Sequence, residues 1–148
     1  MHKNNEIFKI VYLPQESEII FNAKYETPVS LHSDLYSKLL THIDINEWKC
    51  LYEKAYRDWL NDVSDAVCNI HDPVNMLMIA ALIQLNETLP DRRLYYWFDV
   101  DRTYNEGFTW KYCPISGKEL ILLGDGYPKK NYFISPEYPL VFPIYEDC

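Results

Sequence analysis

The sequence predicts an α+β fold, with strands near the N-terminus, helices in the middle and an antiparallel β-region in the last third. Three observations indicate this class. Strand-like runs stand at both ends, a helical periodicity occupies residues 34–88, and turn signals divide the segment 94–145. With 148 residues, 48% of them apolar and 24% charged, the chain has the composition of a globular protein. We expect a single domain that spans residues 1–148.

The N-terminal part predicts two strands and a short helix. Residues 6–13 and 18–25 are β-prone runs, and the turn-forming segment Pro14-Gln15-Glu16-Ser17 separates them. Ser33 stands where it could cap a short helix over residues 34–42.

A long helix is predicted next, because apolar residues recur at steps of three and four. The residues of this stripe are Trp48, Leu51, Tyr52, Ala55, Tyr56, Trp59, Val63, Ala66, Val67 and Ile70. On the same helix Asp58, Asp62 and Asp65 are four and three residues apart, which predicts one acidic stripe. The stripe is either solvated charge or a docking face for a basic partner.

A second helix is predicted to begin at Asp72-Pro73, because Asp caps helices and Pro suits their first turn. Its residues are apolar on nearly all sides, so we expect it to be the central helix. They include Met76, Leu77, Met78, Ile79, Ala80, Ala81, Leu82, Ile83 and Leu85.

The last third predicts a series of short antiparallel strands. Turn signals such as Asn105-Glu106-Gly107, Ser116-Gly117 and Asp125-Gly126 separate the β-prone runs. These runs cover residues 94–98, 108–112, 119–123, 132–135 and 140–145.

Two turns in this region have the frame of a zinc ribbon whose ligands are lost. Such a site needs a pair of cysteines in each half, with about 15–20 residues between the halves. Here Cys113 is followed by Ser116, and after 18 intervening residues Ser135 is followed by Tyr138. One thiol and two hydroxyls do not hold Zn²⁺ tightly, so we expect no metal. The alternative is a plain turn between strands. In the first interpretation apolar packing replaces the metal, through Tyr112, Ile115, Leu120, Phe133, Tyr138 and Leu140.

From about Trp48 onward the chain resembles an uncharacterised bacterial family that contains a zinc ribbon and is a candidate nucleic-acid binder. The resemblance is carried by Trp48 and Tyr56, by Glu87-Thr88-Leu89-Pro90, by Tyr95-Tyr96-Trp97 and by the two ribbon turns. Three of the four ligand positions are not cysteine, so zinc binding is not carried over. The resemblance implies nucleic-acid binding as an alternative function, for which Lys129-Lys130 between Tyr127 and Tyr132 would supply charge beside stacking rings.

The net charge of −8 is uneven along the chain and favours a basic partner over nucleic acid. Residues 58–148 hold 14 acidic and 7 basic side chains, whereas residues 1–57 hold 8 and 7. An acidic surface repels phosphate backbones and attracts basic proteins, although acidity also serves solubility.

The sequence contains no motif for a nucleotide-binding loop, for a pair of metal ligands on one helix or for a nucleophile elbow. We therefore expect no catalysis, no cofactor and no metal. A small hydrolase would require a cavity that gathers His71, Cys113 and a carboxylate. Asp99 and Asp101 end a strand, where Asp is favoured for its backbone hydrogen bonds, which is a simpler reading than a cation site.

A cytoplasmic location is expected, without a membrane segment. The N-terminus has no apolar signal region, and the longest apolar run, residues 76–83, is far short of the ~20 residues of a membrane span. The four cysteines form no CxxC pair, so free thiols are the simplest interpretation.

These features together predict a non-catalytic binding module. The most specific form is an immunity protein that neutralises a bacterial toxin, such as a nuclease used in contact-dependent growth inhibition, by covering its basic active surface. The candidate partner-facing charges are Asp58, Asp62, Asp65, Asp99, Asp101 and Glu106.

Overall fold

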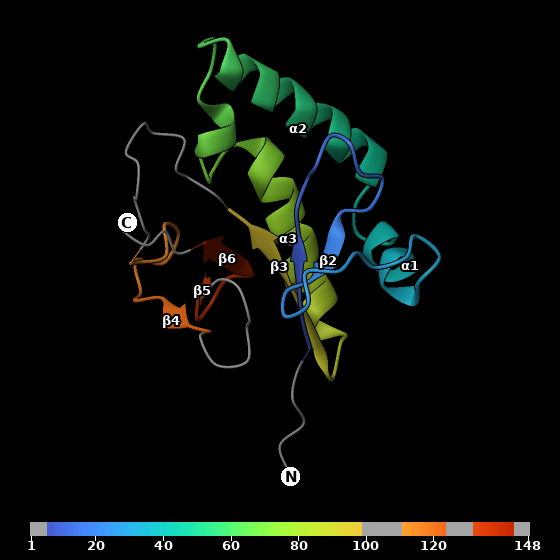
Figure 1. Ribbon diagram of the computed structural model, residues 1–148. Coiled ribbons are helices and arrows are strands. Elements are labelled where there is room, and N and C mark those ends of the chain that lie inside the picture. Colours follow the sequence, from blue (N-terminus) through green and yellow to red (C-terminus); the bar gives the residue numbers. More distant parts are fainter. Residues whose placement is uncertain (1–5, 99–110, 124–131, 144–148) are drawn as a thin grey trace.

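The computed structural model describes residues 6–98, 111–123 and 132–143, and these contain helices and one mixed sheet (Figure 1). The α+β class is therefore confirmed. In chain order the elements are β1 (Glu6–Ile10), β2 (Ile20–Asn22), α1 (Asp34–Leu40), α2 (Ile45–Leu60), the short 3₁₀ helix η1 (Ala66–Cys68), α3 (Pro73–Glu87), β3 (Arg92–Trp97), β4 (Ile121–Leu122), β5 (Tyr132–Ile134) and β6 (Leu140–Pro143).

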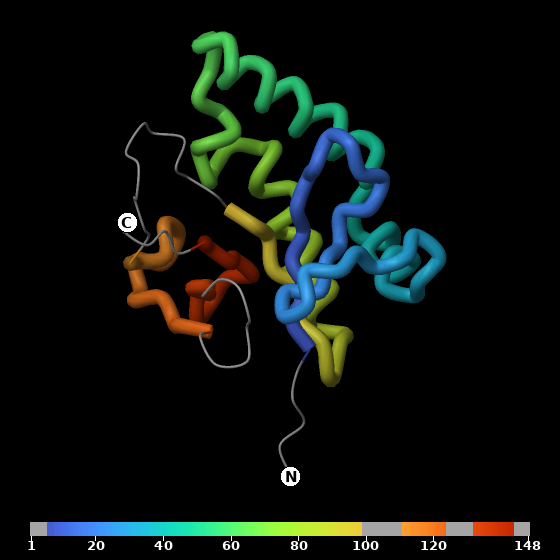
Figure 2. The backbone as a smooth tube through the Cα atoms, viewed as in Figure 1, coloured from blue at the N-terminus to red at the C-terminus, as the bar shows by residue number. Residues whose placement is uncertain are grey.

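The six strands are ordered β2-β1-β3-β6-β5-β4 in one sheet. The pairs β4–β5 and β5–β6 are antiparallel, as the sequence predicts for the last third, and β1–β2 is antiparallel as well. The prediction was wrong for β3, which pairs parallel with β1 and with β6. Parallel neighbours need a long crossover connection, and the helical middle of the chain supplies it between β1 and β3. Figure 2 shows the result, with the blue N-terminal strand beside the yellow one.

The helix α3 is the centre of the core. It packs against β3 on one side and against α2 and α1 on others, and Figure 1 shows it behind β1 and β3. The register pairs Phe8 with Leu94 and Ile10 with Tyr96, and all four are buried. The largest fully buried side chains are Trp48, Tyr96, Tyr132, Phe142, Ile10, Ile19, Ile20, Leu39, Met78, Ile79, Leu82 and Leu85.

The start of α3 is where the sequence places it. The Asp72 carboxylate accepts a hydrogen bond from the Val74 N–H at 3.1 Å, and Pro73 occupies the first turn. The helix is not covered on all sides, because Leu77 and Ile83 remain exposed.

One stretch, Ala66–Glu87, is long and apolar enough to cross a membrane by length and composition, with a mean hydropathy of 1.4. It consists of η1, a turn and α3. The packing of α3 against β3, α2 and α1 explains its apolar character, since the core helix of a globular protein has the same composition.

The helix α2 ends at Leu60, so the predicted helix is confirmed over residues 48–60 and was wrong beyond them. Asp62 adopts a left-handed backbone with φ of 57°. The Asp62 N–H bonds to the Trp59 carbonyl at 3.2 Å, and the Val63 N–H bonds to the Asp58 carbonyl at 2.7 Å. This is a Schellman ending, in which a left-handed residue allows the last carbonyls to be satisfied.

The first helix, α1, is tied to the sheet by a tyrosine. The Tyr36 hydroxyl accepts hydrogen bonds from the backbone N–H groups of Ile19 at 2.7 Å and Ile20 at 2.9 Å. Ser33 stands at the N-cap, as predicted, but its side chain makes no capping hydrogen bond.

Candidate functional site

The predicted acidic residues that the structure describes gather where α2 ends. Asp58 lies in the last turn of α2 and pairs with Lys54 at 3.1 Å. Asp62 is the left-handed residue after the helix, and Asp65 directly precedes η1. They do not form one stripe on one helix, because α2 ends before Asp62. Three further predicted residues, Asp99, Asp101 and Glu106, lie outside the described residues.

Apolar and aromatic side chains lie at the same end of α2. Leu60 is 57% exposed and Val63 is 71% exposed. Tyr56 and Trp59 are half-buried, with ring centroids 5.9 Å apart. Contiguous exposed apolar side chains with a polar rim mark interaction surfaces. We name this region the acidic–aromatic surface, and it consists of Tyr56, Asp58, Trp59, Leu60, Asp62, Val63 and Asp65.

The helix α2 passes the end of the sheet where β1 and β3 finish (Figure 1). Residues of these three elements and of the segment after β1 line a groove that borders the acidic–aromatic surface. Its volume is about 230 Å³. Most of its lining is aromatic or comes from the segment that follows β1, and we name it the aromatic groove. The lining residues are Ile10, Val11, Tyr12, Leu13, Pro14, Tyr52, Tyr56, Tyr96 and Trp97.

Tyr12 is one of the aromatic residues that line the aromatic groove. The rings of Tyr12 and Tyr52 are 5.3 Å apart and tilted by 43°. Burial, and then the charge of Glu53 and its acceptance of the hydroxyl hydrogen bond, raise the pKa of Tyr12. The charge of Arg57 acts in the opposite direction and lowers that pKa, but less than the charge of Glu53 raises it.

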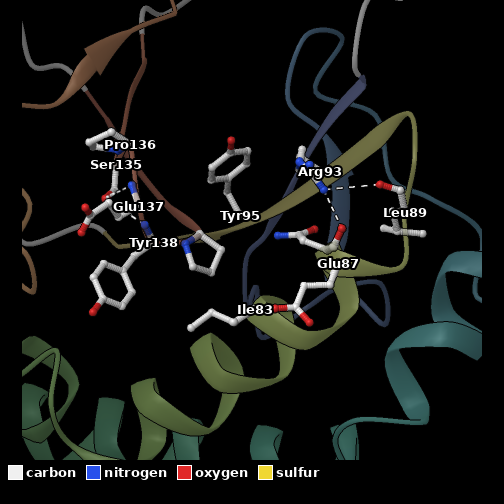
Figure 3. A pocket seen from close by; sticks show the side chains of 11 residues that line it. Ile83, Glu87, Leu89, Arg93, Tyr95, Ser135, Pro136, Glu137 and Tyr138 are labelled. Atoms are coloured by element: carbon white, nitrogen blue, oxygen red, sulfur yellow. Dashed lines mark hydrogen bonds between the residues drawn. The ribbon is translucent and has the colours of Figure 1, made fainter.

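A larger cavity of about 380 Å³ lies between the end of α3, the first half of β3 and the turn 135–139 (Figure 3). Arg93 Nη1 donates hydrogen bonds to the carbonyls of Asn86 at 2.5 Å and Leu89 at 3.3 Å. These bonds satisfy carbonyl groups at the C-terminal end of α3. The Asn86 side chain bonds both the N–H and the carbonyl of Leu94 at 2.9 Å. These polar groups stabilise the first half of β3, which pairs with β1 on one edge but not with β6 on the other.

The two ribbon turns meet in space. Cys113 is buried, its Sγ accepts a hydrogen bond from the Ser116 N–H at 3.5 Å, and Lys118 of the first turn pairs with Glu137 of the second. Ser135 Oγ accepts from the N–H of Tyr138 at 3.2 Å. Burial raises the pKa of the Cys113 thiol, but hydrogen bonds from Ser116, Ser135 and the Ile115 backbone outweigh it and lower the pKa overall.

The apolar residues expected to replace the metal are mostly where the sequence places them. Leu120 and Leu140 are buried, and Ile115, Phe133 and Tyr138 are half-buried against the core. Tyr112 is 60% exposed, so its predicted role was wrong. Within the part of the chain that the structure describes, no three His, Cys, Asp or Glu side chains are grouped as metal ligands would be.

A buried lysine was missed by the sequence reasoning. Lys9 Nζ lies 4.5 Å from the Trp97 ring centroid and 5.0 Å from that of Tyr132. It contacts the Tyr132 hydroxyl at 3.3 Å and Glu26 at 3.4 Å. This cluster joins β1 to β5 across the sheet, so its contacts are structural. A lysine inside an apolar strand run is the only signal that the sequence offers.

A hydrolase would require a cavity that gathers His71, Cys113 and a carboxylate, and neither of the two cavities described above does so. His71 is exposed just before α3, and Cys113 is buried in the first ribbon turn. Neither residue lines the aromatic groove or the larger cavity.

Comparison of the chain with protein-family models, with curated proteins and with solved structures finds no match. The resemblance to a zinc-ribbon family therefore stays a prediction, and the function has to be inferred from the site.

Proposed function

We propose that this protein is a non-catalytic, cytoplasmic binding module that neutralises a basic protein partner, most specifically an immunity protein for a bacterial toxin. The observation that carries the proposal is the acidic–aromatic surface. There exposed Leu60 and Val63 lie beside half-buried aromatic rings and the carboxylates of Asp58, Asp62 and Asp65.

This combination suits the inhibition of a toxin that acts on nucleic acid. The active cleft of a nuclease is basic, because it binds phosphates. Carboxylates on an inhibitor steer such a cleft into contact, and aromatic anchors at the centre of the interface supply most of the affinity. Backbone hydrogen bonds at the end of α2 fix Asp62 and Val63 relative to the helix, which limits the order lost on binding.

Nucleic-acid binding, the alternative, has less support among the described residues. Lys118 pairs with Glu137, and Lys129 and Lys130 lie outside the described residues. Binding to RNA or DNA at low salt that weakens steeply with added salt would favour this alternative.

The direct test is copurification of the chain with the protein that the adjacent gene encodes. We expect a stable complex in which the toxic activity of the partner is suppressed in vitro and in growing cells. A neighbouring protein that is not toxic and does not bind this chain would contradict the proposal. Trp59→Ala should weaken the complex by at least about tenfold, as truncation of an aromatic anchor does. The control is Tyr25→Ala, which removes an aromatic side chain that is 65% exposed and lies outside the acidic–aromatic surface.

A further inference from the structure

We propose that the larger cavity binds an extended peptide segment of the protein partner, which forms main-chain hydrogen bonds with the first half of β3. The proposal rests on the proposed function for the protein that carries the segment, but the cavity itself can be tested with a synthetic peptide. It adds a second contact region, because the larger cavity shares no residue with the acidic–aromatic surface.

The first reason is a gap in the sheet. On one edge β3 pairs with β1 from Arg92 to Tyr96, whereas on the other edge β6 pairs with Tyr96 and Trp97 alone. Pro139, directly before β6, has no N–H that could continue the ladder. Among the described residues, no strand lies beside Arg92–Leu94 on this edge.

An amide group already occupies this gap. The side-chain N–H of Asn86 donates to the Leu94 carbonyl, and the side-chain oxygen of Asn86 accepts from the Leu94 N–H, both at 2.9 Å. A residue on a neighbouring strand that exchanges both bonds with its partner makes the same pair of hydrogen bonds. The gap therefore presents a donor and an acceptor in the arrangement that a peptide main chain fits.

The larger cavity lies at this gap and has room for a short segment. Figure 3 shows the turn 135–139 on one side, Arg93 on the other, and Ile83 and Glu87 of α3 below. The volume of about 380 Å³ lies within the range of about 300–1,000 Å³ that is typical of ligand sites. Asn86 lines the cavity as well, so a peptide that enters can take the place of its side-chain amide.

The charges of the cavity favour a neutral main chain over a charged ligand. Arg93 Nη1 already donates to two carbonyls at the end of α3, and Glu137 already pairs with Lys118. Glu87, the third charged residue of the lining, is exposed. A strongly charged ligand would therefore find little compensation here, whereas a peptide main chain needs only the N–H and the carbonyl of Leu94.

The probe is the neutral, strand-forming peptide N-acetyl-Thr-Val-Thr-Val-Thr amide. It is titrated into the ¹⁵N-labelled full chain, and the backbone signal of Leu94 and the side-chain signals of Asn86 are followed. We expect millimolar binding with shifts of both. The titration is repeated with peptides that carry one N-methyl group at each of the five positions in turn.

The N-methyl series identifies main-chain pairing, because successive N–H groups of a strand point to opposite edges. We expect every second position to weaken binding by at least about fivefold and the positions between to weaken it by about twofold or less, as the loss of one hydrogen bond does. A peptide held by its side chains alone would not show this alternation.

Variants of the chain test the place of binding. Ile83→Trp should abolish it by filling the cavity, whereas Leu77→Trp, at an exposed position of α3 outside the cavity, should leave it unchanged. Asn86→Ala removes the competing amide and should strengthen binding by about two- to fivefold. Its control is Asn46→Ala, at an exposed position of α2. Circular dichroism checks that each variant is folded.

Three results would overturn the proposal. They are equal losses at all five N-methyl positions, unchanged binding to a folded Ile83→Trp variant, and no shifts up to tens of millimolar peptide. A folded Asn86→Ala variant that binds no more tightly would also contradict it. If the peptide fails while a partner copurifies, only this inference is wrong. If the peptide binds but no partner copurifies, the proposed function is wrong.

Discussion

Replacement of Tyr36 by phenylalanine should destabilise the fold strongly, although it removes a single oxygen atom. The Tyr36 hydroxyl accepts hydrogen bonds from the N–H groups of Ile19 and Ile20, and all three residues are buried. The variant leaves two buried donors without an acceptor. Each such donor costs about 1–3 kcal/mol. Since β2 is an edge strand that can shift towards water, we expect a total loss of about 2–4 kcal/mol.

This loss is large against a typical domain stability of about 5–15 kcal/mol. It corresponds to a decrease in Tm of about 5–15 °C for a chain of this size. Urea unfolding, followed by tryptophan fluorescence, measures it as a change in midpoint at constant slope. The control is Tyr25→Phe at an exposed hydroxyl, for which we expect less than about 0.5 kcal/mol. A loss below about 1 kcal/mol for Tyr36→Phe would refute the reasoning, because the two donors would then have found other partners.

Three further predictions concern the buried cation, the titration of the tyrosines and the ribbon turns. Lys9→Met should lower the free energy of unfolding by about 2–3 kcal/mol in urea titrations, because two cation–π contacts and the contact with Glu26 are lost. A smaller loss in Lys9→Met than in the exposed-site variant Lys24→Met would contradict this role. Stability should fall as the pH rises above about 10, because the folded-state pKa values of Tyr12, Tyr36 and Tyr132 are raised above the ordinary value of 10.0. The unfolded tyrosines then lose protons that the folded ones keep, so the stability present below pH 10 is lost progressively. In Tyr132→Phe the alkaline decline should be shallower, and an unchanged slope would show that Tyr132 titrates normally. Finally, the triple variant Ser116→Cys, Ser135→Cys and Tyr138→Cys should bind Co²⁺ with the absorption of a tetrahedral thiolate site, because the two turns already meet around Cys113. Octahedral or undetectable cobalt in a folded triple variant would argue against a zinc-ribbon frame.

Features that depend on neighbouring residues could be predicted from the sequence. The start of α3 is one example, because the side chain of Asp72 and the ring of Pro73 act within a single turn. The end of α2 could not be predicted, because the left-handed residue of its Schellman ending is Asp62 instead of the usual glycine. The apolar spacing then continued across the break by coincidence.

Features that depend on contacts between distant residues were missed. The parallel pairing of β3 with β1 joins strands that are more than 80 residues apart. No pattern among neighbouring residues in the sequence predicts it. The sequence could name only part of the candidate site, through the charge of Asp58, Asp62 and Asp65, which lie at and after the end of α2. The aromatic groove was missed because Tyr12, Tyr56 and Trp97 come from three separate segments. The helical periodicity around Tyr56 indicated only a buried stripe.

The central claim is that the acidic–aromatic surface binds a basic partner, and one affinity measurement tests it most directly. Calorimetric titration of the copurified partner would compare the chain with the variant Asp58→Asn, Asp62→Asn, Asp65→Asn. The control variant Glu16→Gln, Glu87→Gln, Glu119→Gln removes the same charge at exposed positions elsewhere. We predict at least about tenfold weaker binding for the aspartate variant at low salt, and a loss of about twofold or less for the control. Equal affinities for the two variants would contradict the account.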